Sequence, residues 1–285
     1  MWNDPKSSPA FAGEGDRTEC GGGAAGSARR LRRRPLHQPS AGSPPPASWG
    51  RIGALLTLLL ATACEAQQAK QASTFPEPNR PVAPIVSSRY SDEDARDSVG
   101  EFETVVRLAG IAPGMRVADI GAGEGYYTVR LSPLVGREGR VLAQDIIPAT
   151  RDALAERVNR ERLDNVAVKL GEPADPKLPE ASFDRILLIH MYHEIGQPFE
   201  FLWHIRSGLR PDGSIIVVDA DRPTDRHGTP PRLLLCEFSA VGYELARFER
   251  LPDSESYFAQ FVAKGPRPEP GDVPSCPAYA APGAT

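Results

Sequence analysis

The sequence predicts an α/β fold in which helices cover both faces of a doubly wound, mostly parallel, seven-stranded sheet, all within a single domain. Helical and strand patterns alternate from Tyr90 to about Lys264, as they do where each strand of a parallel sheet is followed by a crossover helix. The first strand runs directly into a glycine-rich turn that opens a helix, an arrangement that favours ligand binding at this edge of the sheet.

The predicted elements begin with a helix near Asp92–Ala109, which ends at Gly110. Five strands follow, at Arg116–Ile120, Arg140–Asp145, Val166–Leu170, Asp184–His190 and Ser214–Asp219. The helices between them are expected near Tyr126–Leu134, Ala149–Arg162 and Phe199–Leu209. A last helix, Pro231–Gly242, precedes two strands that complete the sheet, Glu244–Leu251 and Tyr257–Lys264.

Other segments flank this domain, which spans residues 90–265. Residues 1–50 are a low-complexity segment with too few apolar residues to fold, and residues 266–285 are expected to form a disordered tail. Residues 65–89 are interpreted as a linker rich in Pro, Gln and Ala. The basic run Arg29–Arg34 indicates either a nucleic-acid-binding or twin-arginine export signal, or a solvated stretch.

Residues 51–64 resemble a signal peptide, because Arg51 precedes about ten apolar residues and the small-residue pattern Ala61-Thr-Ala63. The run is shorter than the roughly twenty residues that span a bilayer. It is also similar to a lipoprotein signal in which Cys64 would be lipidated and attached to a membrane, although Ala61 stands where leucine is usual. We therefore expect an exported, periplasmic or membrane-anchored protein whose translation begins near Arg51; a buried helix here would instead indicate a cytoplasmic one.

Composition and charge narrow the classes of function. The chain has a formal net charge of −4, and because basic residues are concentrated before residue 51, the folded region is more acidic than the whole. Nucleic-acid binding needs a basic face, so the charge favours a small-molecule substrate and no nucleic-acid partner. The cysteines show no CxxC spacing, so neither a zinc site nor a disulfide scaffold is predicted; they are Cys20, Cys64, Cys236 and Cys276.

The glycine-rich turn carries the functional signal. In the run Val117–Gly125, three glycines stand two residues apart between a strand and a helix. Glycines let a ligand approach the backbone closely, and the start of the helix offers free N–H groups. A dinucleotide-binding turn would read GxGxxG, so the spacing disfavours an NAD-dependent oxidoreductase. The longer run from Leu108 to Ile146 resembles the class I S-adenosylmethionine-dependent methyltransferases, whose first motif reads D/ExGxGxG.

The resemblance covers about Asp92–Lys264 and implies a Rossmann-like fold, methyl transfer and S-adenosyl-L-methionine as the cofactor. It implies that the methionine part of the cofactor would be faced by Asp119, Gly121, Ala122, Gly123 and Gly125. Asp145, followed by Ile146, would bind the ribose, since one carboxylate accepts hydrogen bonds from two hydroxyls. Glu172 and Pro173 would contact the adenine, although aspartate is commoner than glutamate at the first of these positions.

Candidate catalytic residues follow the fourth strand, in the run His190–Glu194. Ligands of doubly wound folds lie outside the carboxyl ends of the strands, so these side chains should border the transferred methyl group. Histidine can remove a proton from an acceptor, and His193 is the favoured candidate, followed by Tyr192 and His190. The alternatives are that these groups only shape the pocket or cap a helix, and that no base is needed because the sulfonium is already activated.

No metal site is predicted. The residues after His193-Glu194 exclude the zinc-protease pattern HExxH. His190 and His193 would need a third ligand to converge on them, and none is visible nearby in the sequence.

The loop from Asp219 to His227 follows the fifth strand, where a substrate should lie, and its Arg222, Arg226 and His227 are candidates to receive an acidic group; such a loop is also commonly only solvated. The favoured function is methyl transfer from S-adenosylmethionine to a small-molecule nucleophile. The alternative is an exported, non-catalytic binding protein that retains the fold, because the cofactor is made in the cytoplasm.

Overall fold

The structure is a computed structural model that describes residues 74–85, 93–252 and 254–278, all within one unit that begins at Gln68. The low-complexity segment 1–50 and the signal-like segment 51–64 lie outside the described residues. Within the described residues, no helix has the length and apolar character needed to cross a bilayer.

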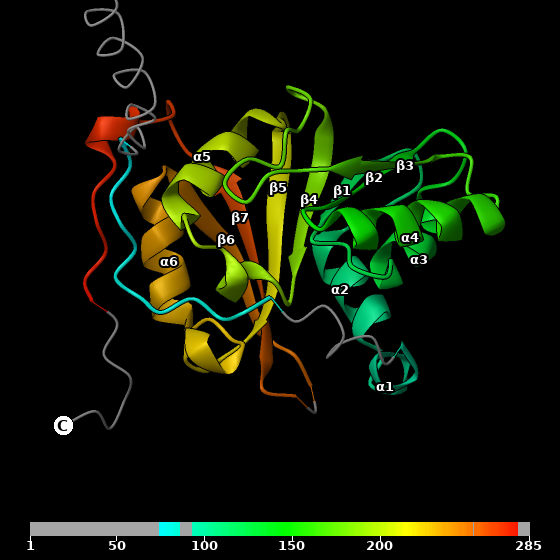
Figure 1. Ribbon diagram of the computed structural model, residues 1–285, viewed down its shortest axis with the longest axis horizontal. Coiled ribbons are helices and arrows are strands. Elements are labelled where there is room, and N and C mark those ends of the chain that lie inside the picture. The colour runs from blue at the N-terminus through cyan, green and yellow to red at the C-terminus, as the bar shows by residue number, and fades with distance from the viewer. Residues whose placement is uncertain (1–73, 86–92, 253, 279–285) are drawn as a thin grey trace, which may run out of the picture. The chain divides into compact units, whose positions relative to one another are not determined.

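The predicted seven strands form one sheet, and the structure shows their order to be β3-β2-β1-β4-β5-β7-β6 (Figure 1). Only β7 runs antiparallel to its neighbours β5 and β6 among the described pairings. The chain order reverses between the adjacent strands β1 and β4, and in open α/β sheets this switch point is where a crevice for ligands forms. The strands are β1 Arg116–Ile120, β2 Arg140–Asp145, β3 Val166–Leu170, β4 Phe183–Ile189, β5 Leu209–Ala220, β6 Tyr243–Arg250 and β7 Ser256–Ala263.

Six α-helices and three 3₁₀ turns are present in the described part of the chain. The helix expected over Asp92–Ala109 is divided in two because Gly100 adopts a left-handed conformation, with φ 61°. The helices are α1 Glu93–Ser98, α2 Glu101–Ala109, α3 Tyr126–Val135, α4 Pro148–Arg160, α5 Pro198–Ser207 and α6 Pro231–Ala240. The turns are η1 Tyr192–Glu194, η2 Thr224–Arg226 and η3 Pro270–Asp272.

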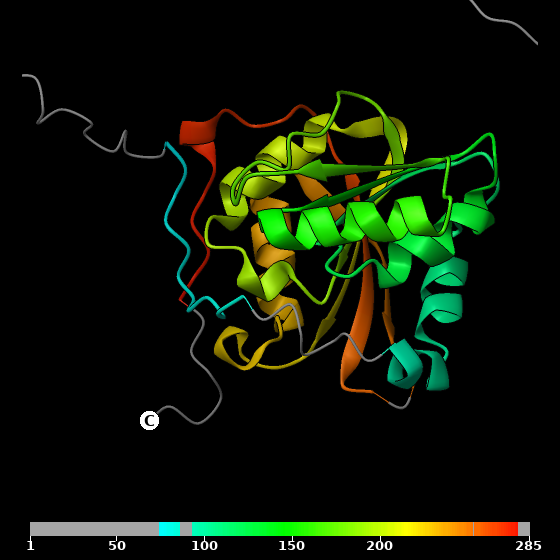
Figure 2. The ribbon, with the colours of Figure 1, turned by 45° about the vertical axis from the view of Figure 1, so that its right-hand side comes forward.

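The alternation of side chains along the strands builds a core on each face of the sheet. On β4, Ile186 and Leu188 pack with residues of α5 and α6, whereas Leu187 between them packs with residues of α2 and α3. All three side chains are fully buried. Helices therefore cover both faces, with α5 and α6 on one side and α2, α3 and α4 on the other (Figures 1 and 2).

The predictions of a linker over residues 65–89 and of a disordered tail over residues 266–285 are wrong for the parts of these segments that the structure describes. Residues 74–85 and 266–278 lie side by side near α6, and Asn79 Nδ2 donates a hydrogen bond of 2.7 Å to the carbonyl of Cys276 (Figures 1 and 2). Phe75 and Val273 are buried in the core on this side. Both segments bury apolar side chains that a composition rich in Pro and Ala conceals, and the domain therefore extends beyond 90–265.

A disulfide joins Cys236 of α6 to Cys276, with the two Cα atoms 6.0 Å apart, which corrects the prediction that disulfide bonding plays no part in this fold. The bond fastens the C-terminal segment across a separation of 40 residues. Closing a loop of this length restricts the unfolded chain, so we expect reduction to lower the free energy of unfolding by about 2–4 kcal/mol. Thermal unfolding with and without dithiothreitol measures this, and a Cys236→Ser/Cys276→Ser variant should not respond. An unchanged melting temperature on verified reduction would contradict it.

Candidate active site

A pocket opens at the carboxyl ends of β1, β2, β3 and β4, where the switch point places it. The turn after β1 forms one wall, and the segment from β4 to η1 forms another. Of the residues predicted to bind the cofactor, seven line this pocket: Gly121, Ala122, Gly123, Asp145, Ile146, Glu172 and Pro173. The structure therefore brings together residues from the segments that follow three separate strands, β1, β2 and β3.

Asp145, at the end of β2, is held by the backbone on both of its oxygens. The N–H of Gly123 donates to Oδ2 at 3.1 Å, and the N–H of Ile147 donates to Oδ1 at 2.9 Å. Asp145 as a whole residue is 7% exposed, and it lines the pocket. Since each carboxylate oxygen accepts more than one hydrogen bond, both retain capacity for hydroxyl donors from a ligand.

Two of the predicted cofactor residues support the turn instead of lining the pocket. Asp119 is buried between its neighbours Ala143 of β2 and Leu187 of β4, and its Oδ2 accepts a 2.6 Å hydrogen bond from Thr128 Oγ1. Gly125 begins α3 with φ 91°, and a Cβ there would stand 2.4 Å from Leu154 Cδ1. Both residues fix the path of the turn, so their contribution to binding is indirect.

Burial raises the pKa of Asp119 to about 6, against the opposing effect of the Thr128 hydrogen bond. Between pH 4 and 6, the folded carboxyl keeps a proton that the unfolded one has lost, so Asp119 lowers stability progressively as the pH rises through this range. We expect Asp119→Asn to gain stability relative to the parent from pH 4 to 7, by at most about 3 kcal/mol. Urea unfolding at several pH values measures the difference in free energy of unfolding between the variant and the parent. A difference that does not change with pH would contradict the raised pKa of Asp119.

The pocket fits a nucleoside cofactor. Gln144 lines it and carries a buried Nε2 that has no hydrogen-bond partner among the described residues. A Cβ on Gly123, which has φ 54°, would meet no atom within 4 Å, so this backbone is open to the pocket. The unpaired amide of Gln144 and the carboxylate of Asp145 match the mixed donor and acceptor groups of an adenosine. Glu172 lies at the pocket edge, with its side chain 66% exposed and paired with Lys177.

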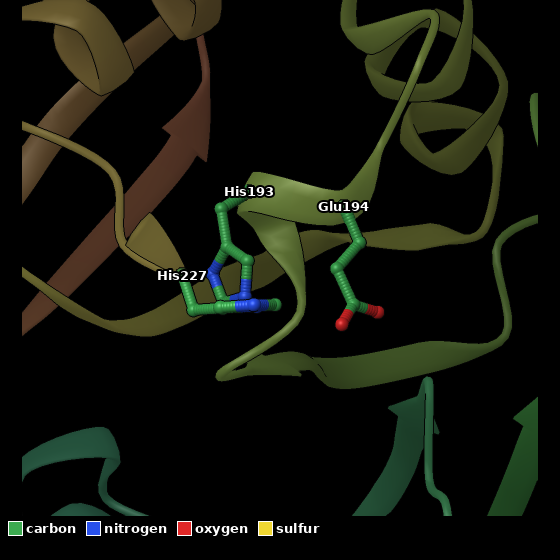
Figure 3. A group of neighbouring side chains, drawn as sticks. All are labelled: His193, Glu194 and His227. Atoms are coloured by element: carbon green, nitrogen blue, oxygen red, sulfur yellow. The ribbon is translucent and has the colours of Figure 1, made fainter. Parts of the chain in front are cut away.

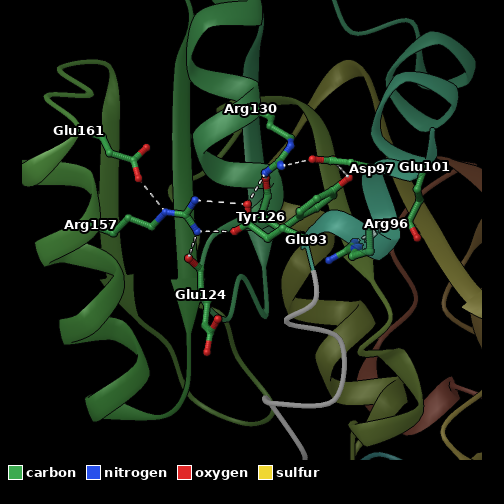
Figure 4. Close-up of polar contacts among 9 residues, drawn as sticks. All are labelled: Glu93, Arg96, Asp97, Glu101, Glu124, Tyr126, Arg130, Arg157 and Glu161. Atoms are coloured by element: carbon green, nitrogen blue, oxygen red, sulfur yellow. Dashed lines mark hydrogen bonds and ion pairs between the residues drawn. The ribbon is translucent and has the colours of Figure 1, made fainter. Parts of the chain in front are cut away.

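Charged contacts hold α1 beside the pocket, although no residue of α1 is buried. Glu93 of α1 forms ion pairs with Arg157 of α4 and Arg130 of α3 (Figure 4). Its Oε1 lies 2.6 Å from Arg157 Nη1, and its Oε2 lies 2.9 Å from Arg130 Nη1. The hydrogen bond from Arg157 keeps the pKa of Glu93 below its usual value. Arg96 stacks 3.9 Å from the Tyr126 ring centroid. Because Glu93, Arg96 and Tyr126 also line the pocket, these contacts shape its mouth.

The three predicted catalytic residues have different surroundings. His190 lines the pocket, and its Nε2 lies 3.0 Å from Glu101 Oε2. Burial raises the pKa of Glu101, but the hydrogen bond and charge of His190, with Arg96, outweigh it and lower the pKa to about 2. Tyr192 does not line the pocket: it is fully buried and donates to Glu237 Oε2 at 2.8 Å. The structure thus assigns Tyr192 to the core, because its side chain points toward α6.

His193 is fully buried, and its Nδ1 lies 3.0 and 3.1 Å from the two oxygens of Asp219, at the end of β5. His193 does not itself line the pocket, but the adjacent Glu194 does. The His227 ring lies 5.4 Å from that of His193, at an interplanar angle of 89°. Figure 3 shows His193 and Glu194 extending from η1 to the same side, with His227 beside them. The sequence contained each residue but no local signal for their convergence.

Comparisons with known proteins match methyltransferases. Residues 99–208 match the family model described as protein-L-isoaspartate(D-aspartate) O-methyltransferase. The protein-L-isoaspartate O-methyltransferase of Methanothrix thermoacetophila is 28% identical over 110 residues, which are 39% of this chain and 50% of that protein. The ubiquinone/menaquinone biosynthesis C-methyltransferase UbiE of Teredinibacter turnerae is 27% identical over 177 residues, 58% of this chain and 65% of that protein.

A third relative, the tRNA (adenine(58)-N(1))-methyltransferase TrmI of Thermus thermophilus, is 32% identical over 118 residues, 41% of this chain and 44% of that protein. The chain thus spans between 44% and 65% of the length of these relatives. Among solved structures, an S-adenosylmethionine-dependent methyltransferase from Aquifex aeolicus matches with a TM-score of 0.58 and 23% identity, over 62% of this chain and 98% of that chain. The described domain therefore has the fold of the class I S-adenosylmethionine-dependent methyltransferases.

Proposed function

We propose that this protein is an S-adenosylmethionine-dependent methyltransferase that acts on a small-molecule nucleophile. The pocket carries the proposal: the glycine turn and the backbone-held carboxylate of Asp145 lie in one cavity with His190 and Glu194. The first two suit the cofactor, and the last two stand where an acceptor would meet it. The matched family model and relatives support the same activity.

When bound, S-adenosylmethionine would supply a methyl group activated by its sulfonium, and transfer of this group to the lone pair of the acceptor would leave a neutral thioether. Asp145 would hold the ribose, and the Gly121–Gly125 turn would let the methionine part lie against the backbone. His190 can take the proton of the acceptor, because Glu101, ionised above pH 2, stabilises the imidazolium that results. Orientation of the two reactants supplies the rest of the acceleration.

A small acceptor is favoured by the acidic domain and by the absence of any further domain within the described residues. The relatives are named for protein, quinone and tRNA substrates, so the acceptor screen needs all three classes. We expect transfer of a labelled methyl group to small nucleophiles and none to tRNA. Labelling of tRNA alone would reverse this choice of acceptor.

We further propose that the protein is exported and attached to a membrane through Cys64. The signal-like segment 51–64 motivates this, and the Cys236–Cys276 disulfide supports it because such bonds persist in oxidising compartments. The same observations favour, as a second candidate, an exported binding protein without activity. Fractionation of cells with mass analysis of the mature N-terminus tests the export, and a cytoplasmic protein without lipid would refute it.

Calorimetry of S-adenosylmethionine binding to the full chain, followed by the labelled-methyl screen, tests the activity. We expect one cofactor per chain and transfer to at least one acceptor class. Binding without transfer would favour the non-catalytic candidate. If the well-folded chain does not bind S-adenosylmethionine, the pocket is not a cofactor site, and both the methyltransferase and the non-catalytic cofactor-binding candidate are refuted.

A further inference from the structure

His193 has one imidazole nitrogen that the fold leaves unused. Its Nδ1 is directed to Asp219, whose oxygens also accept from Thr229 Oγ1 at 2.7 Å and the Ala220 N–H at 2.9 Å. The other nitrogen, Nε2, is buried and has no hydrogen-bond partner in the described part of the chain. A buried polar atom without a hydrogen-bond partner is destabilising, so its position calls for a ligand.

The unused nitrogen belongs to a group of three metal-ligating side chains. The ligand atoms of His193, Glu194 and His227 all lie within 4.8 Å of one another. Ligands bound to one ion at 2.0–2.2 Å are about 3.4 Å apart in tetrahedral geometry, so the three must close by at most about 1.4 Å. Glu194, at a partly exposed position, can supply this movement by rotation of its side chain.

The surroundings of His193 match those of a metal-binding histidine. Such histidines usually donate their second ring N–H to a carboxylate, which fixes the tautomer and raises the basicity of the ligating nitrogen. Asp219 is placed to accept that N–H, and its own remaining contacts come from Thr229 and the backbone. Two imidazoles and one carboxylate suit a divalent transition-metal ion such as Zn²⁺ better than Mg²⁺ or Ca²⁺, which prefer oxygen ligands.

We propose that His193 Nε2, Glu194 and His227 form a site for a divalent transition-metal ion beside the part of the pocket wall that Glu194 forms. Three protein ligands leave a coordination position open, and Glu194 is shared between this site and the pocket wall. The role of the ion rests on the proposed function. In methyl transfer, the ion would bind the oxygen, nitrogen or sulfur atom of the acceptor and promote loss of its proton. His193 then acts as a ligand and not as the base that the sequence favoured.

Zn²⁺ titration of the metal-free full chain by calorimetry tests the site. We expect one strong equivalent, weakened at least tenfold by His193→Gln and by His227→Asn. Asparagine is chosen because His227 has φ 56°, and asparagine tolerates this left-handed region. His204→Gln is the matched control, since His204 of α5 lies outside the group and should leave Zn²⁺ affinity unchanged. Zn²⁺ that binds to residues outside the described part of the chain contributes equally to the parent and the variants, so the difference in affinity between them reports on this site alone.

Cofactor binding and thermal unfolding measured on the same variants separate the possible failures. Variants that melt like the parent and bind S-adenosylmethionine normally, but lose Zn²⁺, support the site. Zn²⁺ binding that is absent in the parent, or unaffected by both substitutions, overturns the metal site and leaves the methyltransferase proposal intact. Strong Zn²⁺ binding that both substitutions weaken, in a chain that binds no S-adenosylmethionine, supports the metal site and overturns the proposed function.

Discussion

Asp145→Asn should weaken S-adenosylmethionine binding at least tenfold, a loss of about 1.4 kcal/mol or more in calorimetry. The carboxylate already accepts from the N–H groups of Gly123 and Ile147, and the ribose hydroxyls are two further donors. An amide keeps one accepting oxygen and turns the other position into an NH₂ group. That group would meet the N–H of Gly123 or a hydroxyl donor, so the substitution replaces an attraction with two opposed donors.

The matched control is Asp152→Asn on α4, where the carboxylate is 63% exposed and pairs only weakly with the neighbouring Arg151. We expect this variant to bind as the parent does, and both variants to melt near the parent temperature. Parental affinity in Asp145→Asn would remove the ribose role of this residue. The pocket would then require another orientation of the nucleoside.

The central part of the fold was predictable because its signals are local. The bounds of β1, β2 and β3 agree with the sequence, since each is a short apolar run bounded by turn residues. β5 is longer than expected because Leu209 pairs with Phe183 before the strand enters the core. The turn at Gly121–Gly125 was expected from its resemblance to the first methyltransferase motif, and Asp145, assigned by the same resemblance, lines the same pocket.

The contacts that the sequence did not reveal join residues far apart in the chain. His193 meets Asp219 because β4 and β5 are neighbours, and their carboxyl ends reach the same edge of the sheet. Cys236 and Cys276 pair because the C-terminal segment returns along α6. Local patterns describe each element but not its neighbours, so such pairs follow only once the strand order is known.

Arg80→Met should lower the free energy of unfolding by about 3–5 kcal/mol, measured by urea denaturation. Its side chain is fully buried, and Nε pairs with Glu237 Oε1 at 2.8 Å. The guanidinium also donates to the carbonyls of Tyr192 and Ile195. These two residues flank the candidate metal ligands His193 and Glu194 in the sequence. Burial raises the pKa of Glu237, so without the arginine this carboxylate would pay its desolvation cost uncompensated or take up a proton.

Two comparisons isolate the buried charge as the cause. Adding Glu237→Gln to Arg80→Met removes the orphaned carboxylate and should restore part of the loss, whereas Lys264→Met, at an ion pair with both side chains exposed, should cost within about 1 kcal/mol. The deficit of Arg80→Met should also shrink as the pH falls, because protonation neutralises Glu237 in the folded variant. A deficit as small as that of Lys264→Met would mean that residues 74–85 are the mere linker that their composition suggests.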